Sequence, residues 1–338
     1  MLSGASEAQN ATHPYASLTP DVVLDALSDL GLAVDGRLMA LSSYENRVYQ
    51  AMLDDGGAVV AKFYRPNRWR DAQILEEHAF AQQLMSDDVP MVGPLTLQGR
   101  TLHHAHGFAF SVSPRRGGRR PELDDVEVLE WLGRFIARLH IVGARSAFES
   151  RPALNLQTFG VEPCDSVLRM DVISPAWRDA WHQACRAALD AVQLAYANCP
   201  HESLRLHGDC HPGNVLWTPT ELPDGGPHFV DLDDARMGPA VQDVWMLLSG
   251  DRAQQTQQLA AVIDGYEQMR EFDRRELGLI EALRTLRLIH YSAWLASRRD
   301  DPAFAQHFSW FGSDAYWAEQ THILREQVEA MQEPPLMV

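Results

Sequence analysis

The sequence predicts an α+β protein with two lobes, a small β-rich N-terminal lobe and a larger, mostly α-helical C-terminal lobe. The chain has 338 residues, which exceeds the size that one hydrophobic core usually serves. Alternating apolar patterns typical of strands gather in its first third, and long helical periodicities fill most of the rest. Because 46% of the residues are hydrophobic, each lobe has enough apolar side chains for a core of its own.

The N-terminal lobe is expected over residues 17–114, after a disordered stretch, residues 1–16. Its first helix has clear end signals, since Thr19 can cap it, Pro20 suits the first turn and Gly31 can end it. The other elements expected in this lobe are strands over about residues 38–64 with one hairpin, a helix carrying Glu76 and Glu77, and strands near residues 92–97 and 107–113.

The C-terminal lobe is expected over residues 122–338, after a basic connection at residues 115–121. The arginines of this connection suit either a solvated hinge or a contact with an acidic partner. The first helix of the lobe, residues 122–143, has one apolar face, formed by Leu129, Leu132, Ile136 and Leu139. Helical periodicity recurs over residues 175–198, 240–249, 253–271, 273–298 and 313–331. Two roles are possible for the aromatic side chains near the C-terminus, which either pack in the core or line a substrate cleft. These residues are Trp294, Trp310, Phe311 and Trp317.

Residues 207–214, His-Gly-Asp-Cys-His-Pro-Gly-Asn, carry the most specific chemical signal in the chain. Asp209 and Asn214 have the spacing of a kinase catalytic loop, in which the Asp accepts the proton of the attacking hydroxyl and the Asn holds a magnesium ion. Phosphoryl transfer needs a carboxylate beside the nucleophile and a neutral oxygen on the metal, and a tight loop can direct both into one small volume.

A hairpin is expected directly after this loop. Residues 214–217 and 228–231 read as its strands, and Asp224-Gly225-Gly226 reads as its turn. Antiparallel pairing would bring Asn214 and Asp231 to the same end, where both could bind Mg²⁺, which prefers hard oxygen ligands. Asp233 suits either a solvated turn or a second metal contact. Asp243 suits a helix N-cap, or a support that accepts hydrogen bonds from the catalytic-loop backbone.

A single lysine, Lys62, lies inside the alternating apolar strand of residues 58–64. Such lysines are usually exposed to solvent. This one follows a hairpin turn, residues 54–57, and therefore occupies the third strand, where kinases place the lysine that contacts the α- and β-phosphates of ATP and pairs with a helix Glu.

No glycine-rich loop occurs between the first two strands, over residues 41–49. Ser43 and Asn46 can still offer side-chain and backbone donors to phosphate oxygens. The chain therefore departs here from the signature of protein kinases.

Together these residues resemble the aminoglycoside phosphotransferase and choline kinase branch of the protein-kinase-like fold, in which Gly precedes the catalytic Asp, as Gly208 does here. Within this branch the chain is most similar to the stress response kinase A family. The segments that carry the resemblance are residues 43–49, 62–66, 74–78, 207–217, 229–236 and 242–245.

The resemblance implies a role for each candidate residue. Asp209 would be the catalytic base, and Asp231, together with Asn214, would bind Mg²⁺ and so take part in catalysis. In the N-terminal lobe, Ser43, Asn46 and Lys62 would contact ATP, Glu77 rather than Glu76 would pair with Lys62, and the backbone near Ser111 to Ser113 would bind adenine.

The resemblance also implies an ATP-dependent Ser/Thr protein kinase of the bacterial stress response that phosphorylates protein substrates and itself. A small-molecule kinase with the same machinery is the main alternative, and a nucleotide-binding module without catalysis is a second. Only 12 positions separate Asp231 from Asp243, which leaves little room for a long activation loop. We therefore expect activity without phosphorylation of such a loop.

Composition and residue patterns indicate which classes of partner and which cellular compartment to expect. A net charge of −17 disfavours nucleic acid as a partner. The four cysteines show no C-x-x-C spacing, so free thiols in a reducing cytoplasm are expected. The first ten residues lack the pattern of a signal peptide, and no apolar stretch reaches membrane-spanning length. A cytoplasmic monomer without membrane contact is expected.

Overall fold

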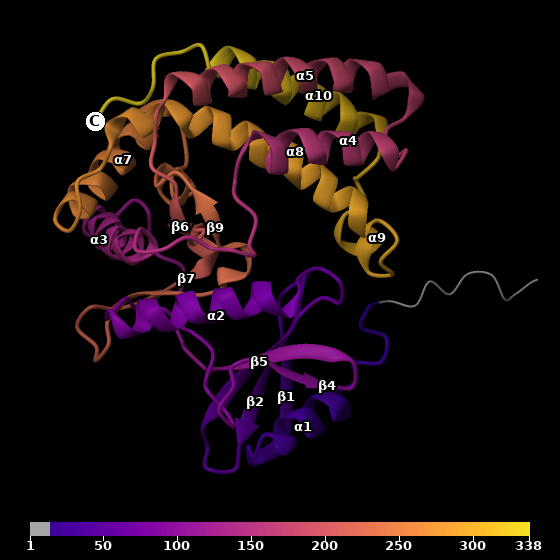
Figure 1. Cartoon of the computed structure of the whole chain (residues 1–338), viewed down its shortest axis with the longest axis vertical. Coiled ribbons are helices and arrows are strands. Elements are labelled where there is room, and N and C mark those ends of the chain that lie inside the picture. The colour runs from indigo at the N-terminus through magenta and orange to yellow at the C-terminus, as the bar shows by residue number, and fades with distance from the viewer. Residues whose placement is uncertain (1–13) are drawn as a thin grey trace, which may run out of the picture. The chain divides into compact units, whose positions relative to one another are not determined.

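The computed structural model describes residues 14–338, which form two compact units (Figure 1). The smaller unit holds the described part of Met1–Leu75 with Pro94–Arg115 and Arg298–Ser309, and the larger holds Glu76–Gly93, Arg116–Ser297 and Trp310–Val338. Neither unit is continuous in sequence, whereas two continuous lobes were expected.

Most of the stretch expected to be disordered, residues 1–16, lies outside the described residues. Disorder is the wrong prediction for residues 14–16, since they belong to a turn in which Tyr15 is buried. The Tyr15 hydroxyl donates to the backbone carbonyls of Glu45 (3.0 Å) and Phe63 (3.3 Å). The ordered chain therefore begins before the first helix.

An antiparallel sheet with the order β1-β2-β3-β5-β4 is the centre of the smaller unit. Its elements are α1 (Pro20–Asp29), β1 (Val34–Leu41), β2 (Arg47–Leu53), β3 (Ala58–Phe63), β4 (His103–Ala105), β5 (Phe108–Pro114) and the short α9 (Phe304–His307). The predicted cap of α1 is confirmed, because the Thr19 hydroxyl accepts a hydrogen bond from the backbone N–H of Val22. Apolar residues of α1, with Leu27 fully buried, share one core with the sheet.

The strand expected at residues 92–97 is a wrong prediction. Within this stretch Leu95 N–H donates to the Val112 carbonyl (2.7 Å), and Leu97 makes only an isolated bridge. Pro90 and Pro94 lack the N–H groups that a continuous ladder needs. The helix with the two glutamates is present as α2 (Asp71–Ser86).

The larger unit is mostly helical and carries two short β-ribbons, β6–β9 and β7–β8. Its helices are α3 (Val126–Gly143), the π-helical η1 (Gln157–Val161), α4 (Glu162–Arg169), α5 (Pro175–Asn198), α6 (Val241–Trp245), α7 (Arg252–Glu267), α8 (Ile280–Arg298, whose last residue belongs to the smaller unit) and α10 (Asp314–Ala330). Its strands and 3-10 turns are β6 (Leu204–Leu206), η2 (Pro212–Asn214), β7 (Val215–Thr218), β8 (Gly226–Phe229), η3 (Leu232–Asp234), β9 (Arg236–Gly238) and η4 (Arg274–Leu279).

Two helix pairs build the core of this unit. Helix α3 packs closely on α7, and α5 runs beside α10 (Figure 1). The first contact needs a glycine, because a Cβ at Gly133 would lie 1.9 Å from the Val262 carbonyl oxygen. Trp181 of α5 meets Trp317 of α10 edge to face, and both are buried. Core packing is therefore the correct reading for Trp317. No helix in residues 14–338 is both long and apolar enough to cross a bilayer.

The basic connection is attached to the β7–β8 hairpin. Arg119 exchanges backbone hydrogen bonds with Trp217, and the Arg116 guanidinium donates to the Asp224 carbonyl. The Arg119 side chain is exposed, as the solvated reading expects, whereas the Arg116 side chain is partly buried against the hairpin.

Candidate active site

The catalytic loop, residues 207–214, connects β6 to β7 in the larger unit. Its predicted support by Asp243 is confirmed. Asp243 Oδ1 accepts from Gly208 N–H (2.8 Å), and Oδ2 accepts from His207 N–H (2.7 Å). Asp243 is fully buried inside α6, where Ala240 occupies the cap position, so the N-cap reading is wrong.

A second buried residue, His140 of α3, completes this support. Its Nε2 lies 3.1 Å from Asp243 Oδ2, and its Nδ1 lies 3.0 Å from the Tyr266 hydroxyl of α7. The carboxylate thereby has a partner for each oxygen although no solvent reaches it, as a buried charge requires. The helices α3, α6 and α7 thus jointly position the backbone of the catalytic loop.

His207 ties the loop to the strand before Asp231. Its Nδ1 accepts from Asp209 N–H (3.4 Å), so the ring proton lies on Nε2, which donates to the Val230 carbonyl (2.9 Å). Gly208 between them has φ 83°, and a Cβ there would lie 2.2 Å from the Asp234 carbonyl oxygen. The Gly at this position is therefore required by the local geometry.

The Asp209 carboxylate has two basic neighbours. His211 Nδ1 accepts from Gly213 N–H (2.9 Å), so the neutral ring carries its proton on Nε2, which lies 3.5 Å from Asp209 Oδ2. Arg287 Nη1 of α8 lies 2.8 Å from Asp209 Oδ1 at angles outside the hydrogen-bond range, so this oxygen has no hydrogen-bond donor within residues 14–338.

These neighbours set the charge of Asp209. Burial alone would raise the pKa of Asp209, but the hydrogen bond from His211 and the charge of Arg287 outweigh it and lower this pKa below its usual value. Asp209 is therefore ionised at neutral pH, as an acceptor of a hydroxyl proton must be.

The two predicted metal ligands lie at one end of the hairpin. The predicted pairing of β7 with β8 is confirmed, with Val215 opposite Phe229, and Val230 N–H donates to the Asn214 carbonyl (3.0 Å). The Asn214 amide nitrogen donates to the Asp209 carbonyl (2.9 Å), which leaves the amide oxygen as the ligand atom. Asp231 is exposed and has the left-handed φ of 63°, a backbone conformation that proteins retain mainly at functional sites.

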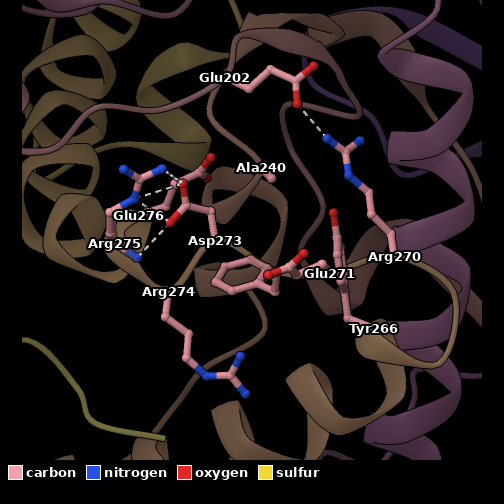
Figure 2. A pocket seen from close by; sticks show the side chains of 10 residues that line it. Glu202, Ala240, Tyr266, Arg270, Glu271, Asp273, Arg274, Arg275 and Glu276 are labelled. Atoms are coloured by element: carbon pink, nitrogen blue, oxygen red, sulfur yellow. Dashed lines mark hydrogen bonds and ion pairs between the residues drawn. The ribbon is translucent and has the colours of Figure 1, made fainter.

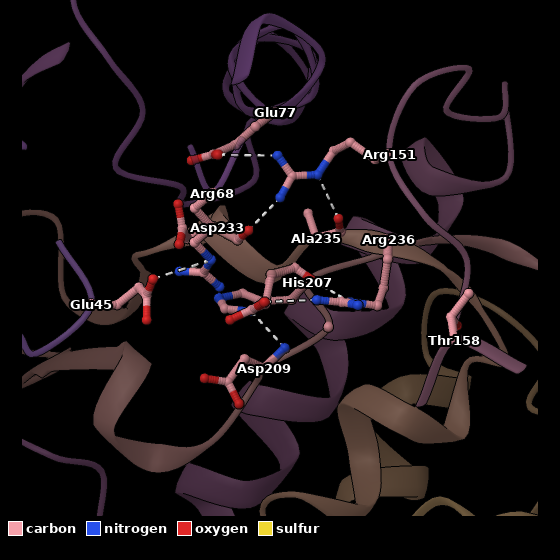
Figure 3. Close-up of polar contacts among 12 residues, drawn as sticks. Glu45, Arg68, Glu77, Arg151, Thr158, His207, Asp209, Asp233, Ala235 and Arg236 are labelled. Carbon is pink, nitrogen blue, oxygen red and sulfur yellow. Dashed lines mark hydrogen bonds and ion pairs between the residues drawn. The ribbon is translucent and has the colours of Figure 1, made fainter. Parts of the chain in front are cut away.

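Asp233 is buried, so the expected solvated turn is wrong for this residue. Its backbone carbonyl accepts a short hydrogen bond from Arg151 Nη2, and Arg151 Nε donates to the Ala235 carbonyl (2.7 Å) (Figure 3). Arg151 Nη1 lies 3.3 Å from Glu77 Oε2. Through this buried arginine, Glu77 of α2 is connected to the turn that follows Asp231.

Glu76 and Glu77 have different roles within the larger unit. The Glu76 carboxylate accepts hydrogen bonds from the backbone N–H groups of Glu149, Ser150 and Arg151 (2.6–3.0 Å). Glu76 therefore anchors α2 to residues 149–151. The pairing of Glu77 with Lys62 stays a prediction, since the two residues belong to different units.

A buried glutamate supports the start of α6. Glu276 Oε2 accepts from Val241 N–H (2.9 Å), and Glu276 lines a cavity of about 570 Å³ together with Asp273, Arg270 and Glu202 (Figure 2). Burial raises the pKa of Glu276 to about 7, although the Val241 hydrogen bond opposes this, and Asp273 raises it further. The carboxylate therefore titrates near neutrality directly beneath the helix that carries Asp243.

In the smaller unit, Lys62 lies on β3 opposite Val48 and Ser111, and its ammonium is 5.0 Å from the Tyr64 ring centroid. Tyr64 N–H donates to the Ala109 carbonyl and Arg115 N–H to the Ala58 carbonyl. By the alternation of antiparallel ladders, the backbone groups of Ser111 and Ser113 also point toward β3.

The adenine contact expected near Ser111 to Ser113 stays a prediction, and the ladder shows which backbone groups of this stretch face away from β3. The backbone groups of Ser111 and Ser113 serve the sheet, and the Ser111 hydroxyl is hydrogen-bonded to the Tyr64 hydroxyl (3.2 Å). The groups that face away from β3 belong to Val112 and Pro114, and the Val112 carbonyl accepts from Leu95 N–H. Within the expected stretch, the Val112 N–H is therefore a backbone donor that is directed away from β3.

The β1–β2 loop, residues 42–46, occupies the position of the glycine-rich loop of protein kinases and contains no glycine. Glu45 pairs with Arg298 (2.6 Å), and Arg65 pairs with Asp301 (2.7 Å). Asn46 is buried and its side-chain oxygen accepts from Arg65 N–H (3.1 Å), so this oxygen supports the loop. The Ser43 hydroxyl makes no hydrogen bond within the described residues and stays available to a ligand.

The structure thus brings Asp209, Asn214 and Asp231 together in the larger unit, while Ser43 and Lys62 lie in the smaller one. Sequence reasoning missed the residues that tune this site: His140, Arg151, His211, Arg287 and Arg298. His211 belonged to the catalytic octet and its spacing from Asp209 could have indicated a contact. The other four residues lie far along the sequence from the loops that they contact, and no local sequence pattern identifies them.

Comparisons with known proteins agree with this geometry. Residues 38–280 match the phosphotransferase enzyme family. The chain is 45% identical over 329 residues to stress response kinase A of Escherichia coli K12, covering 97% of this chain and 98% of that protein. It is 44% identical over 324 residues to the serine/threonine protein kinase RdoA of Salmonella typhimurium, covering 96% and 97%.

Solved structures show the same fold at low sequence identity. An amicoumacin kinase in complex with AMP-PNP, Ca²⁺ and Ami has a TM-score of 0.69 at 17% identity, covering 93% of this chain and 94% of that one. A microcompartment-associated aminopropanol kinase has a TM-score of 0.69 at 18% identity, covering 92% and 98%. The chain has a kinase-like α+β fold, and it belongs to the phosphotransferase enzyme family and, within it, to the stress response kinase A family.

Proposed function

We propose that this kinase transfers the γ-phosphoryl group of ATP to Ser or Thr hydroxyls of proteins, including its own, in the bacterial stress response. The observation that carries the proposal is Asp209, an ionised carboxylate whose Oδ1 has no hydrogen-bond donor within the described chain and which is held next to two metal-ligand candidates. A relative with 44% identity bears the name serine/threonine protein kinase.

The donor set fits a magnesium ion. The Asn214 amide oxygen and the Asp231 carboxylate are hard oxygen ligands, and Mg²⁺ usually takes one or two protein carboxylates together with waters and phosphates. The described residues contain no group of three His, Cys, Asp or Glu side chains suited to a metal. Asn214 and Asp231 would hold the Mg²⁺, which would offset the negative charge of the phosphates.

The residues of the chain then divide the remaining work. Asp209 accepts the proton of the acceptor hydroxyl, and the supports from Asp243 and His207 hold it in place. Lys62 and Ser43 contact the phosphates of ATP, Glu77 orients Lys62, and adenine binds the outward backbone groups of Val112 and Pro114 on β5.

Activity should not require phosphorylation of an activation loop. The segment after Asp231 continues directly into η3 and then β9, which pairs with β6, and Arg236 is paired with Asp234 (2.7 Å). It is therefore already ordered by its own contacts. We propose a cytoplasmic monomer that is active as synthesised.

A small-molecule kinase is the second candidate, because the structurally similar proteins include an amicoumacin kinase and an aminopropanol kinase. Transfer of label from γ-labelled ATP to the protein itself, to a generic protein and to a panel of amino alcohols and aminoglycosides distinguishes the candidates. We expect label on the first two. Label on small molecules alone would contradict the proposal, and no label with intact nucleotide binding would indicate a non-catalytic module.

A further inference from the structure

Helix α8 presents one face to the catalytic base. Arg287 contacts Asp209, and Tyr291 and Trp294 follow it at positions i+4 and i+7, which lie on the same side of a helix. Burial raises the pKa of Tyr291, and the charge of Arg287 opposes this rise. We call Arg287, Tyr291 and Trp294 the α8 face.

The two aromatic residues of the α8 face are not core residues. Tyr291 is 43% exposed and Trp294 is partly exposed, and their rings stack in parallel with centroids 5.7 Å apart. Trp181 and Trp317 in the same unit are instead buried. A stacked pair of exposed aromatic rings offers a flat apolar surface, a feature enriched where proteins bind partners.

The positive charge of Arg287, at the start of the α8 face, acts on the residue next to the acceptor hydroxyl of a substrate. The Arg287 side chain is 42% exposed, so it can contact a bound molecule while it remains beside Asp209. The guanidinium lies 2.8 Å from Asp209 Oδ1, so a hydroxyl that approaches the partly exposed Asp209 carboxylate comes close to this positive charge. An acidic neighbour of the acceptor hydroxyl would be attracted and a basic neighbour would be repelled.

The dimensions of the face suit an extended polypeptide. At 1.5 Å per residue, the seven positions from Arg287 to Trp294 span roughly 10 Å, and an extended chain covers this in about three residues at roughly 3.3 Å each. We propose that the α8 face binds the acceptor segment of a protein substrate in which an acidic residue adjoins the Ser or Thr and an aromatic or apolar residue lies about three positions beyond the acid. This inference rests on the proposed protein kinase activity and specifies its substrate class.

The test compares kcat/KM for peptides that differ at one position. One pair carries Glu or Lys beside the acceptor Ser, and a second pair carries Phe or Ser three positions farther on; each pair is made in both chain directions. For the wild type we expect the Glu peptide to be preferred by roughly threefold to tenfold, as expected for an exposed charge pair. Arg287→Glu should reverse this preference, and Arg287→Gln should abolish it.

Ratios between peptides cancel any effect that Arg287 has on Asp209 itself. Arg325→Gln, an exposed arginine of α10, is the matched control and should keep the wild-type preference. The double variant Tyr291→Ala and Trp294→Ala should lose the preference for Phe and retain the preference for Glu. Nucleotide binding shows that each variant is folded.

The possible results separate the two proposals. If a generic protein is phosphorylated but Arg287→Glu and Arg287→Gln keep the preference for Glu, the α8 face is not the acceptor site while the kinase activity stands. If only small molecules are phosphorylated, the protein kinase proposal and this inference both fail.

Discussion

Two loops of this kinase lack features of the protein-kinase signature, and side chains from outside hold each of them by different means. The catalytic loop is held by the fully buried Asp243, whose oxygens accept backbone hydrogen bonds. The β1–β2 loop is held by the ion pair of Glu45 with Arg298, whose side chains are 12% and 15% exposed. Buried hydrogen bonds to a charge fix a geometry regardless of salt, whereas a partly solvated ion pair responds to ionic strength.

This difference indicates that the two loops differ in rigidity. The loop proposed to perform the proton transfer has a fixed geometry, and the loop proposed to lie over the phosphates is held by contacts that can be weakened. Three changes test this comparison.

Asp243→Ala should have the largest effect. It leaves the N–H groups of His207 and Gly208 and the His140 ring without an acceptor in a buried site, and we expect a loss of about 3–5 kcal/mol in the free energy of unfolding. Urea unfolding measures it. The exposed Asp264→Ala in α7 is the control and should change stability by less than about 0.5 kcal/mol. Similar values for both variants would show that Asp243 does not support the loop.

Glu276→Gln should change how the free energy of unfolding of the protein depends on pH. The folded-state pKa of about 7 lies above the ordinary 4.5, so folding takes up a proton between these values. The stabilising contribution of Glu276 in the wild type is therefore fully present below about pH 4.5 and is lost as the pH rises through about 7. The Gln variant lacks this loss. Its free energy of unfolding should therefore rise relative to that of the wild type by about 2–3 kcal/mol between pH 5 and pH 8.

Chemical unfolding of both proteins at pH 5 and pH 8 measures this difference. The Gln amide oxygen can still accept from Val241 N–H, so the hydrogen bond to α6 is retained. A constant difference between the two proteins at both pH values would mean that Glu276 does not titrate in this range.

The Glu45–Arg298 pair should have the smallest effect. A double-mutant cycle with Glu45→Gln and Arg298→Gln should give a coupling free energy of about 1 kcal/mol at low salt, and 1 M NaCl should reduce it. Thermal unfolding at both ionic strengths measures it. A coupling that salt leaves unchanged would remove the contrast between the two loops.

Local sequence patterns predicted the features that depend on nearby residues. The cap of α1, the β7–β8 hairpin and the placement of Lys62 on the third strand all follow from turn chemistry and alternation within a few residues. The role of Asp243 was also accessible, because an Asp that opens an apolar helical run after the catalytic loop supports that loop in kinase-like folds.

Features that depend on distant side chains could not be predicted. Arg287 contacts Asp209 from the middle of α8, and Arg298 contacts Glu45 from its C-terminal end. An arginine on a helix carries no sequence mark of its partner. The burial of Asp233 depends on Arg151, whose position only tertiary packing decides. Which backbone groups near Ser111 to Ser113 face away from β3 depends on register, which the sequence of one strand does not reveal.

The most direct measurement is the rate of γ-phosphoryl transfer by Asp209→Asn at saturating ATP, with nucleotide affinity measured in parallel. Asn keeps the shape of the side chain and removes the proton acceptor. We predict a fall of roughly 10²- to 10⁴-fold in kcat with nearly unchanged nucleotide binding. A normal rate in this variant would show that Asp209 is not the catalytic base and would contradict the proposed mechanism.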